Sequence, residues 1–362
     1  MKANHKAFLT LLRLGIGNQS YKGIWSLSDI DTVDWDAIEA HANIHGLLGV
    51  VIDGIDLLPE GRKPPKSVLL QWIGEVLQGY EYRYELYRHA LKELANFYNS
   101  HEIHMMVLKG YACGLNWPRP EHRPCGDIDI WLYGKQDEAD SLLLNEKGVK
   151  VDKSEHHHTL FYWDDFLVEN HYDFLNIHQH KSSAQMEIIF KELGADDSHS
   201  IEIDGVRVNV PSPNLHALFL LKHSMVHFAA EGINLRQMLD WAFFVKSHRT
   251  EIDWTWLENT LEQYGMKPLY EIYNAICVED LGFSPSLFQH VQFNSLLKER
   301  VLKDILEPDY SKNLPSGMLR RVIYKYRRWK ANEWKRKLCF KESTWTAFWS
   351  GVWNHLLKPS TI

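Results

Sequence analysis

Apolar residues recur at helical spacing through the first hundred positions. The clearest stripe runs from Tyr80 to Tyr98, through residues three or four positions apart: Tyr84, Tyr87, Leu91 and Leu94. Such spacing places side chains on one face of a helix. Prolines and a glycine between Leu57 and Pro65 predict a loop ahead of this stripe. We therefore expect residues 1–100 to form an N-terminal helical region that acts as a scaffold.

The pattern changes between residues 101 and 213, where short apolar runs alternate with turn residues. The runs Met105–Leu108 and Gly126–Leu132 predict two buried strands. Two hairpins are expected further on, the second around Asp204-Gly205, a pair of residues that two-residue turns prefer. With an amphipathic helix at Asp137–Asn145, this segment predicts a small mixed α/β domain.

Helical stripes return after residue 213 and continue toward the C-terminus. The segments Leu215–Phe228, Leu235–Ser247 and Trp254–Tyr264 each carry apolar residues on one face. We expect residues 214–362 to form a C-terminal helical domain. The fold class predicted for the whole chain is therefore α+β, with a small mixed sheet flanked by N-terminal helices and a C-terminal helical bundle.

Composition narrows the class of protein without naming a function. A chain of 362 residues that is 45% hydrophobic and 24% charged is typical of a globular protein with a sizeable core. The formal net charge of -7 argues against a globally basic nucleic-acid binder. Four cysteines without CxxC spacing favour a reducing compartment. Because no apolar stretch is long enough for a transmembrane segment or a signal peptide, we expect a cytoplasmic protein.

The candidate chemistry centres on Gly126-Asp127-Ile128-Asp129-Ile130. Side chains alternate along a strand, so Asp127 and Asp129 would lie on the face opposite the isoleucines. Two neighbouring carboxylates on one face can bind a hard cation through oxygen. Such a pair can also be no more than the solvated edge of a strand. The motif alone does not decide between a metal site and a strand edge.

The surrounding residues resemble the nucleotidyltransferase superfamily, whose members include DNA polymerase β-like enzymes. Leu108-Lys109-Gly110 precedes the acids, Arg123 follows in a proline-rich loop, and the strand reads DIDI. This order is similar to a branch of uncharacterised bacterial nucleotidyltransferases with the pattern "LKG … R … DIDI". The resemblance extends over residues 30–245, and it implies a nucleotidyltransferase-like sheet at the centre of the chain.

The resemblance implies a reaction in which Mg²⁺, or Mn²⁺ in its place, assists transfer of a nucleoside monophosphate from an NTP to an unknown hydroxyl or phosphate acceptor. Asp127 and Asp129 would bind the metal ions. Glu169 matches the family's third acid; it would complete one metal site and accept the acceptor's proton. Since the match departs at the neighbouring residues, Asp173 and Glu187 stay open as rivals for the third carboxylate.

Four further residues are candidates for binding the nucleotide or the acceptor. Lys109 would lie at the phosphates, and Gly110 would allow the backbone and a helix start to approach them. Arg123 could bind a phosphate or pair with Asp127. His171 falls on the family's histidine. Lys109 could equally be a solvated lysine at a helix start, and for His171 a hydrogen-bonded structural histidine is the strong alternative.

The helices after residue 213 supply a second group of candidates. His223 and His227 are four positions apart, a spacing that can bind zinc, but core-edge packing is the favoured explanation because the glutamate of HExxH is missing. Arg236 and Asp240 resemble the family's "LR-x-x-x-D" helix, which would face the nucleotide or acceptor; a helical ion pair between them is the alternative. The run His156-His157-His158 is assigned no role, because three adjacent side chains cannot easily face one ion.

The last segment is basic and aromatic. Its cations alternate with aromatic side chains and include Arg320, Arg321, Lys325, Arg327, Arg328, Lys330, Lys335, Arg336 and Lys337. We expect a solvated helix face; contact with an anionic partner such as RNA or lipid is the second interpretation.

Two other classes of function remain open. A non-catalytic partner-binding protein could keep the fold without binding metal. A metal-dependent phosphohydrolase could use the same acids without an acceptor. For the transferase, the sequence predicts an NTP donor and a small-molecule or macromolecular acceptor of unknown identity.

Overall fold

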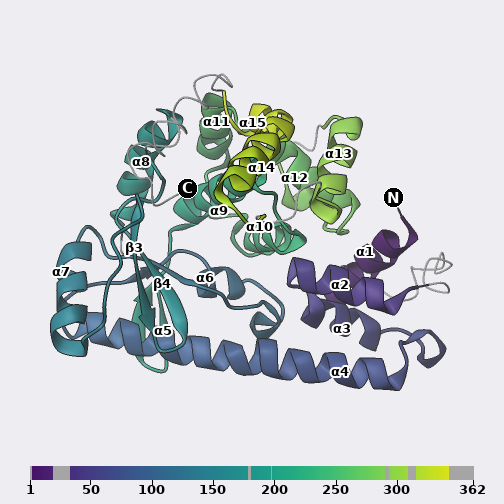
Figure 1. The fold of residues 1–362 in the computed structure, drawn as a ribbon, viewed down its shortest axis with the longest axis horizontal. Coiled ribbons are helices and arrows are strands. Elements are labelled where there is room, and N and C mark those ends of the chain that lie inside the picture. The colour runs from purple at the N-terminus through teal and green to yellow at the C-terminus, as the bar shows by residue number, and fades with distance from the viewer. Residues whose placement is uncertain are drawn as a thin grey trace.

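Helices frame a central sheet in the computed structural model, which describes residues 2–18, 33–177, 181–196, 198–289, 293–308 and 315–341. The N-terminal helices are α1 (Ala3–Gly15), α2 (Trp35–His45) and α3 (Leu48–Asp56). After a short turn at Glu60–Arg62, α4 (Lys66–Val76), the π-helical η4 (Leu77–Tyr82) and α5 (Arg83–Asn99) continue as one long rod along the edge of the molecule (Figure 1). The predicted stripe from Tyr80 to Tyr98 is therefore helical.

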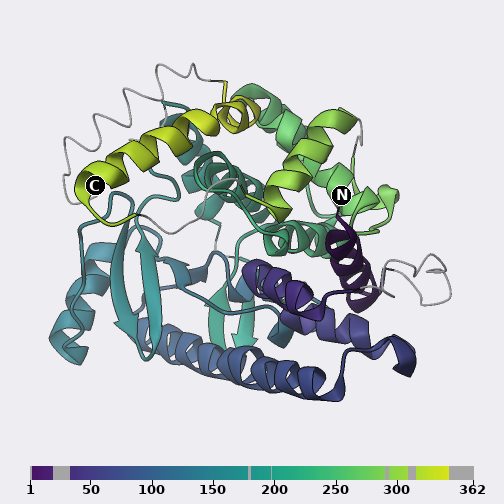
Figure 2. The same ribbon diagram turned by 45° about the vertical axis from the view of Figure 1, so that its right-hand side comes forward.

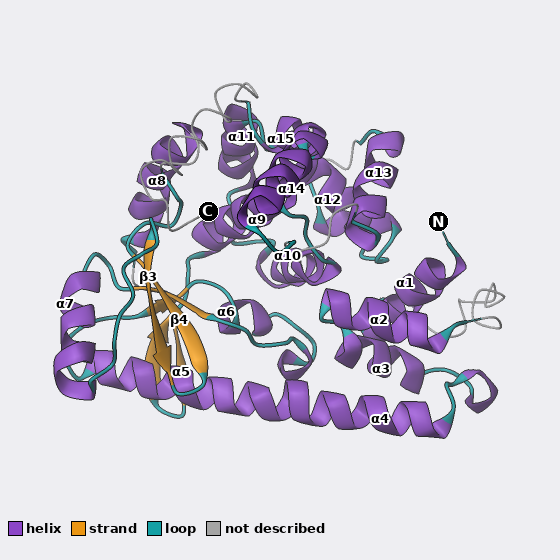
Figure 3. Cartoon of the chain, viewed as in Figure 1, coloured by secondary structure: helices purple, strands orange, loops and turns teal. Residues whose placement is uncertain are grey.

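The central sheet has six strands in the order β3-β4-β2-β1-β6-β5. Their bounds are β1 (Met106–Val107), β2 (Ile128–Trp131), β3 (His158–Trp163), β4 (Phe166–His171), β5 (Ser200–Ile203) and β6 (Val206–Asn209). β2 runs parallel to β4 and antiparallel to β1, and the two predicted hairpins are β3–β4 and β5–β6. The sheet lies between the α4–α5 rod and the C-terminal helices (Figure 3).

One face of the sheet packs on α5. Ile128, Ile130 and Val168 share a buried cluster with Tyr87 and Leu91 of the rod. Because side chains alternate, the residues between the isoleucines face the opposite side of the sheet. The short elements between the strands are α6 (Tyr111–Gly114), η5 (Pro120–His122), α7 (Gln136–Leu142) and η6 (Leu143–Lys147).

The opposite side faces helices of the C-terminal part of the chain, with α9 and α10 nearest the cavity. α8 (Lys181–Gly194) lies between β4 and β5 in sequence. The helices after β6 are α9 (Pro213–Ala230), α10 (Leu235–His248), α11 (Trp254–Tyr264), α12 (Lys267–Glu279), η7 (Pro285–Leu287), α13 (Ser295–Leu306), α14 (Met318–Ala331) and α15 (Glu333–Cys339). Proline at the first position of α9 starts that helix, since its fixed φ suits the first turn and its missing N–H has no intrahelical partner there.

The N-terminal helices pack against the C-terminal ones. A single buried cluster includes Phe8 and Leu12 of α1 together with Tyr270 and Leu281. Arg13 also donates hydrogen bonds to the carbonyl oxygens of Asp280 and Glu279, at 2.7 and 2.8 Å. Figure 2 shows these purple and green helices side by side. Segments far apart in sequence thus share one core.

The α+β class predicted from the sequence is confirmed, with the mixed sheet between two sets of helices. The division at residues 100 and 213 stays a prediction. Among the described residues, no helix has the length and apolar character needed to cross a membrane.

Candidate active site

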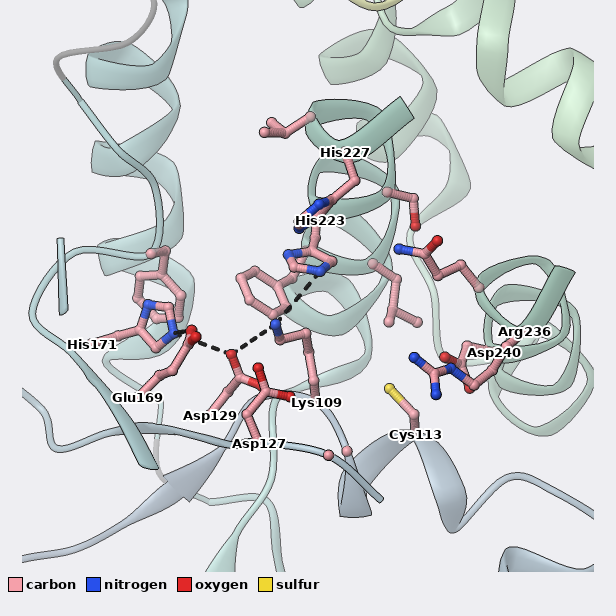
Figure 4. Close-up of a pocket in the computed structure, with 18 of the residues that line it drawn as sticks. Lys109, Cys113, Asp127, Asp129, Glu169, His171, His223, His227, Arg236 and Asp240 are labelled. Atoms are coloured by element: carbon pink, nitrogen blue, oxygen red, sulfur yellow. Dashed lines mark hydrogen bonds and ion pairs between the residues drawn. The ribbon is translucent and has the colours of Figure 1, made fainter. Parts of the chain in front are cut away.

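A cavity of about 480 Å³ opens between the sheet and the helices α9 and α10. Asp127, Asp129, Glu169 and His171 reach it from the sheet side, and His223, His227, Arg236 and Asp240 reach it from the helices (Figure 4). Lys109, Gly110 and Arg123 also line it, so the nine residues to which the sequence assigned a metal-binding or substrate-binding role all belong to this one cavity wall.

The register of two parallel strands brings Asp129 and Glu169 together. Asp129 on β2 is the direct partner of Glu169 on β4. Neighbouring residues in register point to the same face of a sheet, here the face away from α5. Asp129 is only 1% exposed. One ligand atom from each of Asp129, Glu169 and His171 lies within 4.8 Å of the others, which is close enough to hold a metal ion.

Lys109 and His171 neutralise the buried Asp129. The Lys109 Nζ atom lies 2.7 Å from Asp129 Oδ1, and His171 Nε2 lies 3.3 Å from the same oxygen. Burial opposes the charged form of Asp129, but these two cations hold its pKa well below its usual range. Burial would also lower the pKa of His171, but hydrogen bonds to Asp129 and Glu169 raise it to about 9. Lys109 is therefore no solvated lysine, and that alternative is wrong.

Asp127 is exposed at the cavity, just ahead of β2. Its backbone oxygen accepts a 3.1 Å hydrogen bond from the Tyr87 hydroxyl, which fixes the chain before the strand. Burial by its surroundings and the nearby Asp129 raise the pKa of the Asp127 carboxyl. A cation placed between the two carboxylates would relieve this repulsion.

Gly110 has a steric reason to be glycine. Its φ is 58°, and a Cβ there would lie 2.4 Å from the Tyr87 hydroxyl. The helix expected after it is a single buried turn, Tyr111–Gly114. The helix start is therefore not exposed as expected, and a single turn sums few peptide dipoles. A phosphate at Lys109 and Gly110 stays a prediction.

Arg123 pairs with Asp240 and not with Asp127. Its Nε and Nη2 atoms donate to the two carboxylate oxygens of Asp240 at 2.7 and 3.0 Å, and both side chains are buried. Trp117 Nε1 donates a further 2.8 Å hydrogen bond to Asp240. The helical ion pair considered between Arg236 and Asp240 is also wrong, because Arg123 takes up the Asp240 carboxylate.

Arg236 reaches the cavity without an anionic partner. Among the described residues, its guanidinium makes no ion pair, and its buried Nε atom has no hydrogen-bond acceptor. Burial and the neighbouring Arg123 lower the pKa of Arg236. The cavity wall thus holds one cation whose charge no described carboxylate pairs with directly.

The three acids proposed for the third carboxylate lie in different places. Glu169 lines the cavity. Asp173 faces Lys191, whose Nζ lies 2.5 Å away. Glu187 accepts backbone hydrogen bonds from Phe174 and Leu175 at 3.0 and 2.9 Å. The two rivals thus make structural contacts, Glu187 with the backbone of two residues of the cavity wall, and of the three acids Glu169 alone lines the cavity itself.

Several histidines reach the cavity that the sequence did not assign to it. His223 Nε2 lies 3.5 Å from Lys109 Nζ, and its ring centroid is 4.4 Å from that of His227. His157 and His158 also line the cavity. The sequence assigned the histidine run no role, yet two of its members reach the cavity wall where the chain bends into β3. The tract itself was the signal, but its approach to β4 depends on the hairpin register.

The basic C-terminal segment forms α14 and α15. Arg320, Arg321, Arg327 and Lys330 are exposed, whereas Lys335 is buried and pairs with Asp304 at 2.6 Å. Arg336 stacks 4.1 Å over the Trp329 ring. The segment combines a solvated face with cations that pack inward.

The oxygen donors fit a hard divalent cation. Asp129 and Glu169 are adjacent, Asp127 is accessible, and one of the cations that balance them is the flexible side chain of Lys109. Carboxylate oxygens are the ligands that Mg²⁺ prefers.

Comparison with known proteins identifies a family for most of the chain. A model of a family described as uncharacterised nucleotidyltransferase matches residues 31–282, which include every candidate residue. One solved structure is similar, the crystal structure of an antigenic nucleotidyltransferase-like protein from Paracoccidioides brasiliensis. It is 14% identical with a TM-score of 0.36, over 56% of this chain and 96% of that chain. No curated protein matches the chain.

Proposed function

The chain belongs to the family of uncharacterised nucleotidyltransferases, and from this membership we propose that it transfers a nucleoside monophosphate from an NTP to a hydroxyl or phosphate acceptor, with release of pyrophosphate. The observation that carries the proposal is the pairing of Asp129 with Glu169 across parallel strands, with Asp127 beside them at the cavity. Asp127, Asp129 and Glu169 would hold Mg²⁺, or Mn²⁺ in its place. When bound, these ions supply positive charge that stabilises the transition state of phosphoryl transfer.

Glu169 and Asp127 have different surroundings, and we propose different roles for them. Burial opposes the charged form of Glu169, but its hydrogen bond with His171 lowers its pKa, so its oxygens are unprotonated at neutral pH. In the proposal, Glu169 accepts the proton of an acceptor hydroxyl. Asp127 is exposed, and the pKa of its carboxyl is raised. In the proposal, the cation that pairs with this carboxylate is the metal ion that arrives with the NTP.

Cations around the acids would bind the phosphates. Lys109 pairs with Asp129 in this structure, and its 16% exposed side chain is within reach of the cavity. In the proposal, Lys109 leaves Asp129 and binds a phosphate of the NTP when the site fills. His171 keeps its place by hydrogen bonds to Asp129 and Glu169 and orients both. Gly110 allows a phosphate to approach the backbone.

Arg236 and the Arg123–Asp240 pair face the same cavity from the other side. In the proposal, Arg236 binds an anionic group of the nucleotide or acceptor, because its guanidinium has no described partner and carries donors matched to phosphate oxygens. Arg123 binds Asp240 and thereby attaches the loop that precedes β2 to α10. In the proposal, Asp240 has this structural role.

A pyrophosphate assay distinguishes this proposal from its rivals. The protein would be incubated with each NTP and Mg²⁺, with and without a pool of small molecules from a cell extract. Transfer predicts pyrophosphate only with the pool, and the label of an α-labelled NTP in a new product. A phosphohydrolase would consume NTP without the pool. A partner-binding protein would consume none under any condition, and Asp127→Asn would then match wild type.

We also propose a cytoplasmic location and a role for α14 in contacting an anionic partner. Its exposed cations contrast with a net charge of -7. Retention on immobilised heparin should fall when Arg320, Arg321 and Arg327 are replaced by glutamine. Unchanged retention would mean that α14 is only a solvated face.

Cell fractionation tests the proposed cytoplasmic location.

A further inference from the structure

Three histidines meet at one end of the cavity. His158 begins β3 directly opposite His171 on β4, and His157 precedes it at the strand entrance. The ring centroid of His157 lies 4.3 Å from that of His158 and 5.6 Å from that of His171. The hairpin register therefore brings the rings together, although His157 and His158 are adjacent in sequence.

The ring nitrogens have the spacing of metal ligands. One nitrogen from each of the three histidines lies within 4.8 Å of the others. His157 Nε2 is 3.2 Å from His158 Nδ1. In a tetrahedral site with metal–nitrogen bonds of about 2.0–2.1 Å, neighbouring ligand atoms are about 3.3 Å apart. This pair already has that separation.

Glu169 supplies a fourth ligand atom to the same group. Its Oε2 lies 3.5 Å from His171 Nε2 and 3.9 Å from His158 Nδ1. His158 and His171 are buried, at 8% and 4% exposure. His171 Nδ1 lies 3.3 Å from the carbonyl oxygen of Asp173, and a hydrogen bond there leaves Nε2 directed toward the carboxylates. Glu169 thus lies beside two of the three histidines.

We propose that His157, His158, His171 and Glu169 bind a borderline transition metal ion, of which Zn²⁺ is the representative. Imidazole nitrogen selects Zn²⁺ and its neighbours over Mg²⁺, whereas the carboxylates of Asp127 and Asp129 favour the hard ion. The cavity thus carries two metal preferences side by side, with Glu169 common to both. The histidine site stands on its own geometry and does not depend on nucleotidyl transfer.

Cobalt binding by the full-length, untagged protein tests the site. Co²⁺ reports its own coordination, because four-coordinate Co²⁺ absorbs visible light strongly and six-coordinate Co²⁺ weakly. We expect one equivalent of Co²⁺ to give the strong four-coordinate spectrum, and Zn²⁺ to displace it. His157→Asn and the double variant His157→Ala/His158→Ala should weaken binding by more than about 100-fold, since losing even a supporting partner of a ligand costs roughly 10–100-fold.

Two control variants separate this site from others in the cavity. His223→Ala/His227→Ala removes a histidine pair from the same cavity, and Asp127→Asn removes an acid of the proposed Mg²⁺ site; both should bind Co²⁺ as wild type does. A weak six-coordinate spectrum, or equal binding by wild type and His157→Asn, overturns the proposal. Loss of the Co²⁺ spectrum in Asp127→Asn also overturns it, because the ion would then lie among the carboxylates. Circular dichroism confirms that each variant folds, and His157→Asn, which alters only the strand entrance, serves if the double variant does not.

Discussion

Two arginines in the cavity wall have opposite relations to their neighbours. Arg123 holds the buried Asp240 through two hydrogen bonds, so its charge is matched inside the protein. Arg236 makes no ion pair with a described residue, and its buried Nε has no described acceptor. Removing a member of a buried pair leaves a charge stranded, whereas removing an unpaired cation does not.

Replacing each arginine with methionine separates these roles. Arg123→Met should lower the free energy of unfolding by about 3–5 kcal/mol, because Asp240 is left buried and unpaired. Arg236→Met should leave that free energy equal or higher and weaken NTP binding by about 10–100-fold, the worth of a charge-assisted hydrogen bond. Urea unfolding and NTP titration measure the two effects. Equal destabilisation by both variants would contradict the assignment.

At the scale of single residues, the sequence predicts which side chains line the site better than it predicts which residues they bind. Asp127, Asp129 and Glu169 could be named because alternation and family resemblance act on local patterns. The partner of Arg123 could not, because Asp240 is 117 positions away and only the packing of α10 brings it close. The histidine run was set aside because three adjacent side chains cannot easily face one ion; that His158 lies opposite His171 depends on the β3–β4 register, which the local pattern does not contain.

Close helix contacts depend on small residues. α1 and α3 approach so closely that a Cβ on Gly54 would lie 2.1 Å from the backbone oxygen of Leu11, and one on Gly15 would lie 2.0 Å from that of Val50. The stripes in the sequence predicted helices here but not their separation. Which faces meet depends on the whole core, and local spacing does not contain that information.

Alanine at two helical glycines tests this contact. Gly54→Ala should lower the free energy of unfolding by about 1–3 kcal/mol or more, because the clash is with backbone and the helices must separate. Gly74→Ala in α4 has nothing within 4 Å of its Cβ and should raise the same free energy by about 0.5–1 kcal/mol. Urea denaturation compares them. Stabilisation by both would show that α1 and α3 are not in close contact.

The junction between α2 and α10 depends on a neutral histidine. His45 is fully buried at the end of α2, and its Nδ1 accepts a 3.2 Å hydrogen bond from the backbone N–H of Leu235. Burial, with the nearby His41 and His5, lowers the pKa of His45 to about 3. The unfolded chain would protonate this ring at about pH 6.5. Stability from His45 is therefore fully present above pH 6.5 and is lost as the pH falls toward 3.

Glutamine at position 45 should remove this pH dependence. The side-chain oxygen of His45→Gln can still accept from Leu235 but does not titrate. Between pH 7 and pH 5 wild type should lose about 2 kcal/mol more of its unfolding free energy than the variant does. Urea unfolding at the two pH values gives this difference. Parallel losses would mean that His45 is not held neutral in the fold.

At the scale of the whole molecule, three segments of the sequence form or support the cavity. The sheet provides the acids, α9 and α10 provide Arg236 and the histidine pair, and α2 supports α10 through His45. The sequence predicted the α+β class correctly. It did not predict that α1 and α12 share one core, because such contacts join residues more than two hundred positions apart.

The most direct test of the account is thermal unfolding with each of the four NTPs, with and without Mg²⁺. Wild type, Asp127→Asn and the control Asp165→Asn, an exposed acid in the β3–β4 turn, would be compared. An NTP at about 100 times its Kd should stabilise the fold by roughly 2.7 kcal/mol. We predict that this stabilisation requires Mg²⁺, is lost in Asp127→Asn and is kept in Asp165→Asn. No shift with any NTP, or the same shift in Asp127→Asn, would contradict a metal-dependent nucleotide site at these acids.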